Sequence, residues 1–204
     1  MSYETSDHFV GARGFFDDAT PEAATSDVPP GWSRNPSARR RRQLFAAVAT
    51  VGLLATCYLA LYQLGVLPRV FEPLFGDGSR RALDTWVGRL LPGSEAAVAS
   101  VSFFAQAVLA LLGPDDRWRT RPGLAIALGV IAGPLALVGV ALTIVQTAVF
   151  DAWCTLCLAS AAIAAGLAGV ALEEALAALQ ALRRRAEDRG PAFPAPAPLS
   201  EARP

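Results

Sequence analysis

Four long apolar runs without a charged side chain constrain this chain more than any other feature. They cover residues 44–67, 96–112, 123–150 and 152–172. An α-helix rises ~1.5 Å per residue, so ~20 apolar residues cross a bilayer core of ~30 Å. Because backbone amides in lipid must be hydrogen-bonded within their own segment, we expect each run to be helical. A buried core helix would explain one such run but not four. The sequence therefore predicts an all-α integral membrane four-helix bundle.

The composition supports a membrane protein and excludes several other classes. Hydrophobic residues make up 53% of the 204 residues and charged residues 18%, whereas soluble domains carry about a quarter charged residues. Arginine supplies all 18 basic side chains, which balance 18 acidic ones, so the net charge gives no reason to expect nucleic-acid binding. The single histidine, His8, lies in a polar tail. We therefore expect no metal site and no histidine-based catalysis.

Polar segments flank the predicted helical domain, which spans residues 42–182. Residues 1–38 are rich in Asp, Glu, Pro, Ser and Gly, a composition typical of a disordered tail. Residues 173–186 should continue the fourth helix beyond the bilayer. Residues 187–204, in which Pro alternates with Ala, are predicted to be a second disordered tail because such a sequence cannot hold a helix.

The distribution of arginine predicts the orientation in the membrane. Within residues 34–189, twelve arginines lie before the first run, between the second and third runs, or after the fourth, whereas four lie between the first and second runs. Arginine-rich loops stay in the cytoplasm. We therefore expect a multi-pass protein of the bacterial inner (plasma) membrane with both termini cytoplasmic and the loop of residues 68–95 outside.

This outer loop contains a second helical pattern. Apolar residues recur at helical spacing over residues 79–91, and Asp77, Gly78 and Ser79 supply turn and N-cap chemistry before it. The pattern predicts a short amphipathic loop helix on the membrane surface or on the bundle. We interpret it as a lid over the outer mouth of the bundle, the alternative being a solvated connector. The predicted lid residues are Leu83, Trp86 and Val87.

The cysteines carry the clearest chemical signal. Cys154 and Cys157 form a Cys-x-x-Cys motif at the outer start of the fourth run, and residues i and i+3 of a helix share a face. With Asp151 as the predicted N-cap, Cys154 lies in the first turn, where the helix dipole stabilises a thiolate. This arrangement is typical of thiol–disulfide exchange in an oxidising compartment. The alternative is that these cysteines, like the deeper Cys57, only fill space.

Uncharged polar residues gather toward the outer ends of the first three runs. Polar groups within a bilayer usually face the bundle interior and often mark a ligand site. At the depth of Cys157, such a cluster could bind the polar head of a molecule whose tail lies in lipid, as in a quinone. The alternative is hydrogen bonding between helices. The predicted quinone-binding candidates are Tyr58, Tyr62, Ser102, Thr143, Gln146 and Thr147.

Four helices, an outer loop with a half-helix, and the segment FDAWCTLCLAS at the start of the fourth run together resemble the vitamin K epoxide reductase family over about residues 42–182. The resemblance implies a membrane thiol–quinone oxidoreductase that takes a quinone of the ubiquinone or menaquinone type as substrate. It implies that Cys157 reacts with the quinone. It also implies that Cys154 exchanges disulfides with a thioredoxin-like extracytoplasmic protein and supports disulfide formation there.

The outer loop of this chain contains no cysteine, whereas loops of the family usually carry a pair. Gly78 stands where the resemblance places the second of them. Without a relay, we expect Cys154 to be accessible to a soluble partner and Cys157 to be shielded by the lid around Trp86. The same absence supports a second hypothesis, a non-catalytic membrane interaction or scaffold protein that retains this fold.

Overall fold

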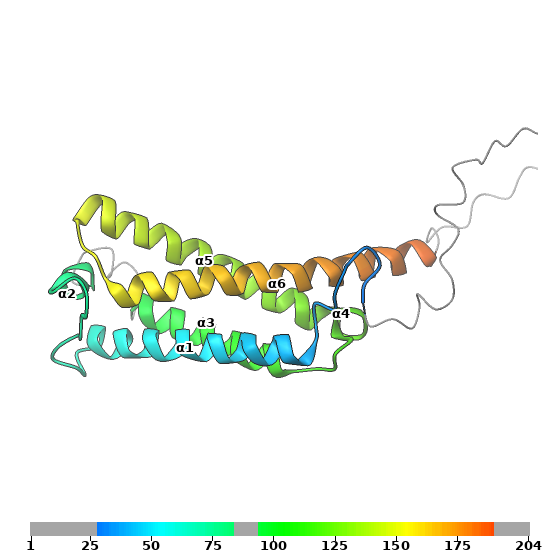
Figure 1. Ribbon diagram of the computed structural model, residues 1–204, viewed down its shortest axis with the longest axis horizontal. Coiled ribbons are helices and arrows are strands. Elements are labelled where there is room, and N and C mark those ends of the chain that lie inside the picture. Colours follow the sequence, from blue (N-terminus) through cyan, green and yellow to red (C-terminus); the bar gives the residue numbers. More distant parts are fainter. Residues whose placement is uncertain (1–27, 84–93, 190–204) are drawn as a thin grey trace, which may run out of the picture. The chain divides into compact units, whose positions relative to one another are not determined.

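The computed structural model describes residues 28–83 and 94–189, which fall into two units (Figure 1). In the first unit, residues 28–35 form turns in which the Trp32 N–H donates to the Pro29 carbonyl oxygen at 3.0 Å. The second unit, from residue 36, contains the helices and confirms the predicted all-α class. They are α1 (Arg39–Gln63), α2 (Gly78–Leu83), α3 (Glu95–Leu111), α4 (Arg117–Thr120), α5 (Pro122–Phe150) and α6 (Thr155–Asp188).

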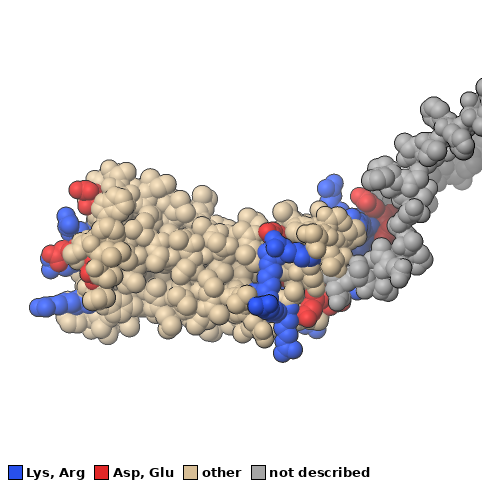
Figure 2. Space-filling model, in the orientation of Figure 1, with Lys and Arg blue, Asp and Glu red and all other residues tan. Residues whose placement is uncertain are grey.

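Length and surface chemistry place the helical unit in a membrane. Helices α1, α5 and α6 are long and apolar enough to cross a bilayer, and α3 is a shorter apolar helix of 17 residues. Charged side chains gather at the two ends of the unit and leave an uncharged band between them (Figure 2). Large apolar side chains in this band are exposed, for example Leu54 at 65% and Leu137 at 73%. These features fit a multi-pass membrane protein with three or four spans.

Small residues allow the helices to approach closely. The most extensive contacts join α1 to α3 and α5 to α6, and α1 also contacts α6 (Figure 1). At Gly52 an added Cβ would lie 2.6 Å from the Phe103 ring, and at Gly129 it would lie 2.9 Å from the Ala175 Cβ. In lipid, close packing of this kind replaces the hydrophobic effect as the main attraction between helices.

The helix ends differ from the predicted bounds for local reasons. Helix α1 begins at Arg39 rather than residue 44, because arginine is a good helix former and continues the turn outward. It ends at Gln63 rather than residue 67, because the chain reverses at Gly65, whose φ of 75° is accessible to glycine. Helix α6 begins at Thr155 rather than residue 152 and continues to Asp188. Of the amphipathic loop helix predicted over residues 79–91, α2 is the described part.

Buried charge closes the end of the bundle that carries α4, here called the inner end. Arg117 is fully buried, and its Nε and Nη2 donate to the two carboxylate oxygens of Glu174 at 2.5 and 2.6 Å. Its Nη1 donates to the Leu109 carbonyl oxygen at 2.6 Å, and the Arg42 Nε donates to the Ala110 carbonyl oxygen at 2.8 Å. The last carbonyls of α3, which lack partners within the helix, are thereby satisfied.

Candidate redox site

The cysteine motif lies where α5 turns into α6, at the opposite, outer end of the bundle. Asp151 has a left-handed φ of 45° and ends α5, and the next N–H, of Ala152, donates to the Gln146 carbonyl oxygen at 3.0 Å. The N-cap of α6 is Cys154, whose Sγ accepts from the Cys157 N–H at 3.1 Å. The prediction that Asp151 caps α6 is therefore wrong. Asp tolerates the left-handed region, so it terminates one helix instead of starting the next.

Cys154 and Cys157 form a disulfide with a Cα–Cα distance of 5.2 Å. In the reduced state, the amide that now donates to the Cys154 Sγ would stabilise a thiolate at this sulfur, together with the positive end of the helix dipole. The third cysteine, Cys57, is a half-buried free thiol in α1. The geometry thus provides one two-electron redox pair at the start of α6.

A cover formed by α2 and its preceding loop buries the first cysteine. Cys154 is 1% exposed and packs with Ala82 of α2. The cover fits closely, because a Cβ on Gly78 would lie 1.9 Å from the Trp153 carbonyl oxygen. The Phe75 and Trp153 rings also approach, with centroids 5.7 Å apart. The prediction of an accessible Cys154 is wrong for this arrangement, since a partner thiol could reach its sulfur only after α2 moved.

Glu72 fastens this cover to α6. Its carboxylate accepts from the Thr155 N–H at 3.1 Å and from the hydroxyls of Ser79 and Thr155. Burial by itself would raise the pKa of Glu72, but these hydrogen bonds outweigh it and hold the pKa below its usual value. One ionised carboxylate therefore joins the loop, α2 and the first residue of α6.

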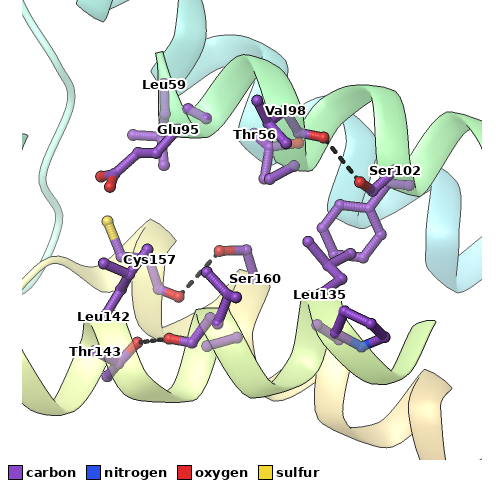
Figure 3. Close-up of a pocket in the computed structure, with 18 of the residues that line it drawn as sticks. Thr56, Leu59, Glu95, Val98, Ser102, Leu135, Leu142, Thr143, Cys157 and Ser160 are labelled. Carbon is purple, nitrogen blue, oxygen red and sulfur yellow. Dashed lines mark hydrogen bonds between the residues drawn. The ribbon is translucent and has the colours of Figure 1, made fainter. Parts of the chain in front are cut away.

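A cavity of about 480 Å³ opens beside the second cysteine (Figure 3). The sulfur of Cys157 faces it, and residues of α1, α2, α3, α5 and α6 line it. Of the predicted quinone-binding candidates, it brings together Ser102, Thr143 and Gln146. The further polar lining residues are Thr56, Glu95 and Ser160.

The other three candidates are not among the described lining residues. The Tyr58 hydroxyl accepts from the Phe71 N–H at 2.9 Å and so supports the outer loop. Tyr62 packs in an apolar cluster around Leu59. Thr147 donates from its hydroxyl to the Thr143 carbonyl oxygen at 3.0 Å.

Glu95 was not among the predicted site residues. It is the first residue of α3, directly after the N-cap Ser94, whose Oγ accepts from the Ala97 N–H at 3.0 Å. Its carboxyl group points toward the sulfur of Cys157 (Figure 3). Burial raises the pKa of Glu95, which precedes the apolar run of α3. The sequence signal that could have identified Glu95 as a site residue is its position immediately before an uncharged run.

The predicted lid is described in part. Leu83, the last residue of α2, lines the cavity. Trp86 and Val87 lie outside the described residues, so their role stays a prediction. Within residues 28–83 and 94–189, no cluster of three or more His, Cys, Asp or Glu side chains could hold a metal ion.

The model of the vitamin K epoxide reductase family matches residues 43–172, which include α3, α5, most of α1, about the first half of α6 and the cysteine pair. No curated protein is similar enough to the chain to count as a match. Members of the family are generally quinone-dependent thiol oxidoreductases, and the Cys154–Cys157 pair is present here. Because the match covers more than half of the chain, the protein belongs to the vitamin K epoxide reductase family.

Proposed function

We propose that this protein is a membrane thiol–quinone oxidoreductase that passes two electrons from the reduced Cys154–Cys157 pair to a ubiquinone- or menaquinone-type quinone. The regenerated disulfide would then oxidise a thioredoxin-like extracytoplasmic protein and so support disulfide formation. One observation carries the proposal, namely that the sulfur of Cys157 faces the cavity. A redox sulfur at the wall of a membrane cavity can react directly with a lipid-soluble oxidant.

The cavity suits a quinone in size and polarity. Its volume of about 480 Å³ accommodates a ring with its first isoprene units, since ligand pockets commonly measure ~300–1,000 Å³. Glu95, Thr143 and Ser160 lie near Cys157, whereas Leu135 lies at the other end of the cavity (Figure 3). Val98 of α3 and Val130 of α5 line the cavity and are 51% and 64% exposed. This supports an opening toward lipid between α3 and α5, through which an isoprenoid tail would leave.

The two sulfurs differ in their surroundings, which supports a division of labour. Cys157 would react with the quinone, because its sulfur faces the cavity. Cys154 would exchange disulfides with the protein partner, because it lies on the side covered by α2 rather than by α3 and α5. Under this proposal, displacement of α2 precedes each exchange.

The electron transfer to quinone is tested with purified protein in detergent. Given a dithiol and a soluble quinone analogue, the wild type should produce quinol, and Cys157→Ala should not. Cys57→Ala is the matched control, since this thiol is not among the described cavity-lining residues, and should keep wild-type activity. Equal quinone reduction by Cys157→Ala and the wild type would refute the proposal.

The protein partner is tested by trapping in cells. The Cys157→Ser variant should accumulate a mixed disulfide between Cys154 and a thioredoxin-fold protein, detected by non-reducing electrophoresis and mass spectrometry. Trapping through Cys157 in the Cys154→Ser variant would instead reverse the roles of the two sulfurs. If neither variant traps a protein, the electron donor is not a thiol protein.

A non-catalytic scaffold is the second candidate, favoured by the absence of cysteine from residues 68–95. It requires that function be indifferent to the thiols. A Cys154→Ser, Cys157→Ser double variant should then complement a deletion strain as well as the wild type does. Loss of complementation would reject the scaffold and favour the redox function.

The proposed site requires an oxidising outer compartment. We propose the bacterial inner (plasma) membrane as the location, with both termini in the cytoplasm and α2 outside. The concentration of arginine beside the inner ends of α1, α3, α5 and α6 supports this orientation. The reverse orientation would put the disulfide in the reducing cytoplasm.

A further inference from the structure

We propose that Glu95 is a catalytic residue that moves protons between the cysteine pair and the quinone, a role that rests on the proposed function. Reduction of a quinone to a quinol needs two protons as well as two electrons. In a membrane cavity these protons must come from a side chain or from water. The cavity therefore needs a group that can release and regain a proton beside the reacting sulfur.

Glu95 is placed for this role. Its carboxyl group points toward the sulfur of Cys157 at the same part of the cavity (Figure 3). Of the described lining residues, Glu95 and Cys157 are the two that can titrate. The remaining polar side chains that face the cavity are neutral hydroxyls and an amide: Thr56 of α1, Ser102 of α3, Thr143 and Gln146 of α5, and Ser160 of α6.

The cavity hydroxyls donate hydrogen bonds to backbone carbonyl oxygens of their own helices. Ser102 donates to the Val98 oxygen at 2.9 Å, Thr143 to the Gly139 oxygen at 2.8 Å, and Ser160 to the Cys157 oxygen at 3.0 Å. Such hydroxyls can still accept hydrogen bonds but are poor proton donors. Among the described lining residues, this leaves the Glu95 carboxyl as the best proton donor.

The surroundings of Glu95 favour each of its protonation states through a different effect. Burial beside an apolar cavity favours the protonated form and raises the pKa. The carboxyl also belongs to the first turn of α3, where the positive end of the helix dipole stabilises an anion after the proton has left. A carboxyl group whose pKa is raised by burial and whose anion is also stabilised is suited to proton transfer.

The proposed step balances in atoms and electrons. The two thiols of the reduced pair lose two electrons and two protons as the bond between the Cys154 and Cys157 sulfurs forms. The quinone gains two electrons and two protons and leaves as quinol. The Glu95 carboxyl gives its proton to a quinone oxygen and regains one from a thiol, so it is unchanged over the cycle.

The test is single-turnover reduction of a soluble quinone analogue by the pre-reduced, full-length protein across a pH series. The wild-type rate should rise with pH as the attacking thiol ionises and fall at higher pH as Glu95 loses its proton. Glu95→Gln has the same size but cannot ionise. It should reduce the quinone ~10²–10⁴-fold more slowly, the usual effect of losing a general acid, and should lack the falling limb.

Two further variants make the result interpretable. Glu95→Asp keeps a carboxyl group, so its rate should still fall at high pH, with the midpoint shifted. This variant keeps the proposal testable if Glu95→Gln does not fold. Glu173→Gln removes a carboxylate on α6 at the inner end, where it pairs with Arg41, and should leave the rate and pH profile unchanged. In steady-state turnover with a dithiol as reductant, the KM for the quinone analogue should change less than kcat in Glu95→Gln.

The outcomes separate this inference from the proposed function. If Cys157→Ala is inactive while Glu95→Gln keeps the wild-type rate and both limbs, the oxidoreductase stands and the role of Glu95 is overturned. Retention of the wild-type pH profile by Glu95→Gln with a raised KM alone would likewise overturn it, since that is the signature of a binding contact. If the wild type itself does not reduce the quinone, both proposals fail.

Discussion

Replacing Glu174 with Ala tests whether the buried charges at the inner end hold the bundle together. Glu174 accepts two hydrogen bonds from the Arg117 guanidinium and a third from the Ser37 hydroxyl. The side chains of Arg117 and Glu174 are 0% and 4% exposed. Truncation would leave a guanidinium in the protein interior without its counter-charge.

Removing one partner of a buried ion pair costs about 3–5 kcal/mol, because the remaining charge is desolvated and uncompensated. Arg117 would keep its bonds to the Leu109 and Leu112 carbonyl oxygens, at 2.6 and 2.8 Å, which favours the lower end of that range. We expect a loss of about 3 kcal/mol, a large part of the ~5–15 kcal/mol that stabilises a typical protein. For a chain of this size this corresponds to a decrease in Tm of roughly 6–12 °C.

The assay is thermal unfolding in detergent, with Glu173→Ala as the matched control. Glu173 is the adjacent residue of α6 and pairs with Arg41, but these side chains are 38% and 22% exposed. Partly exposed ion pairs contribute about 0–1 kcal/mol. The control should therefore unfold within a few degrees of the wild type, whereas Glu174→Ala should unfold well below it.

A double variant separates the effect of the buried ion pair from the effect of the arginine hydrogen bonds to the α3 carbonyls. Arg117→Met, Glu174→Leu removes the buried ion pair, but the α3 carbonyls lose one of their two arginine donors. We expect this variant to be less stable than the wild type, since buried carbonyls without partners are costly in an apolar setting. Equal stability of Glu174→Ala and Glu173→Ala would refute the assignment of a stabilising role to the buried pair.

Three further outcomes are expected. Gly78→Ala should displace α2, because the added Cβ would meet the Trp153 carbonyl oxygen. Maleimide should then label reduced Cys154 several-fold faster than in the wild type. An unchanged labelling rate would contradict the conclusion that α2 shields Cys154. The pKa of Glu72 is lowered when α2 is docked, so the ionised carboxylate stabilises docking above its free pKa, and this stabilisation is lost as the pH falls through the pKa of the docked state. The amides of α2 should therefore lose protection from hydrogen exchange in acid, after correction for intrinsic exchange rates. Glu72→Gln should abolish this pH dependence. A reporter fused after Arg185 should be active only as a cytoplasmic reporter, and an exported fusion would reject the proposed orientation.

The helices could be predicted from the sequence because an uncharged run of sufficient length has one stable form in lipid. Their ends could not, since they depend on single local partners. Helix α1 stops where Gly65 takes a positive φ, and α6 starts three residues late because the Cys154 sulfur accepts the capping hydrogen bond. An Asp before a helix usually signals an N-cap. Asp151 instead ends α5, where it adopts a left-handed φ.

Depth in the membrane was easier to predict than rotation about each helix axis. Ser102, Thr143 and Gln146 were singled out because they lie at the level of Cys157, and the cavity brings them together. Tyr58 lies at a comparable depth but supports the outer loop instead. Polar residues on lipid-embedded helices are too few to define which face turns inward, so sequence alone cannot separate the two groups.

Glu95 and Cys154 illustrate contacts that depend on distant parts of the chain. Glu95 is the last residue of the predicted outer loop, and only the approach of α6 to the start of α3 turns its carboxyl toward a redox sulfur. The burial of Cys154 likewise depends on α2, which docks through Glu72 about eighty residues earlier in the chain. No local pattern encodes either arrangement.

The two ends of the bundle are stabilised by different kinds of interaction, and this difference bears on catalysis. At the inner end, two arginines donate hydrogen bonds to the carbonyls of α3, and one of them, Arg117, forms an ion pair with Glu174. Movement there would separate buried charges at a cost of several kcal/mol. At the outer end, the cover over Cys154 is a six-residue helix docked on a partly exposed carboxylate, Glu72, and such segments open at low free-energy cost. Motion that admits a partner thiol should therefore be concentrated in α2 and its loop, while α3, α5 and α6, which form most of the cavity wall beside Cys157, stay in place. A rigid base with a movable cover would let one disulfide meet a soluble protein and a membrane quinone by separate routes.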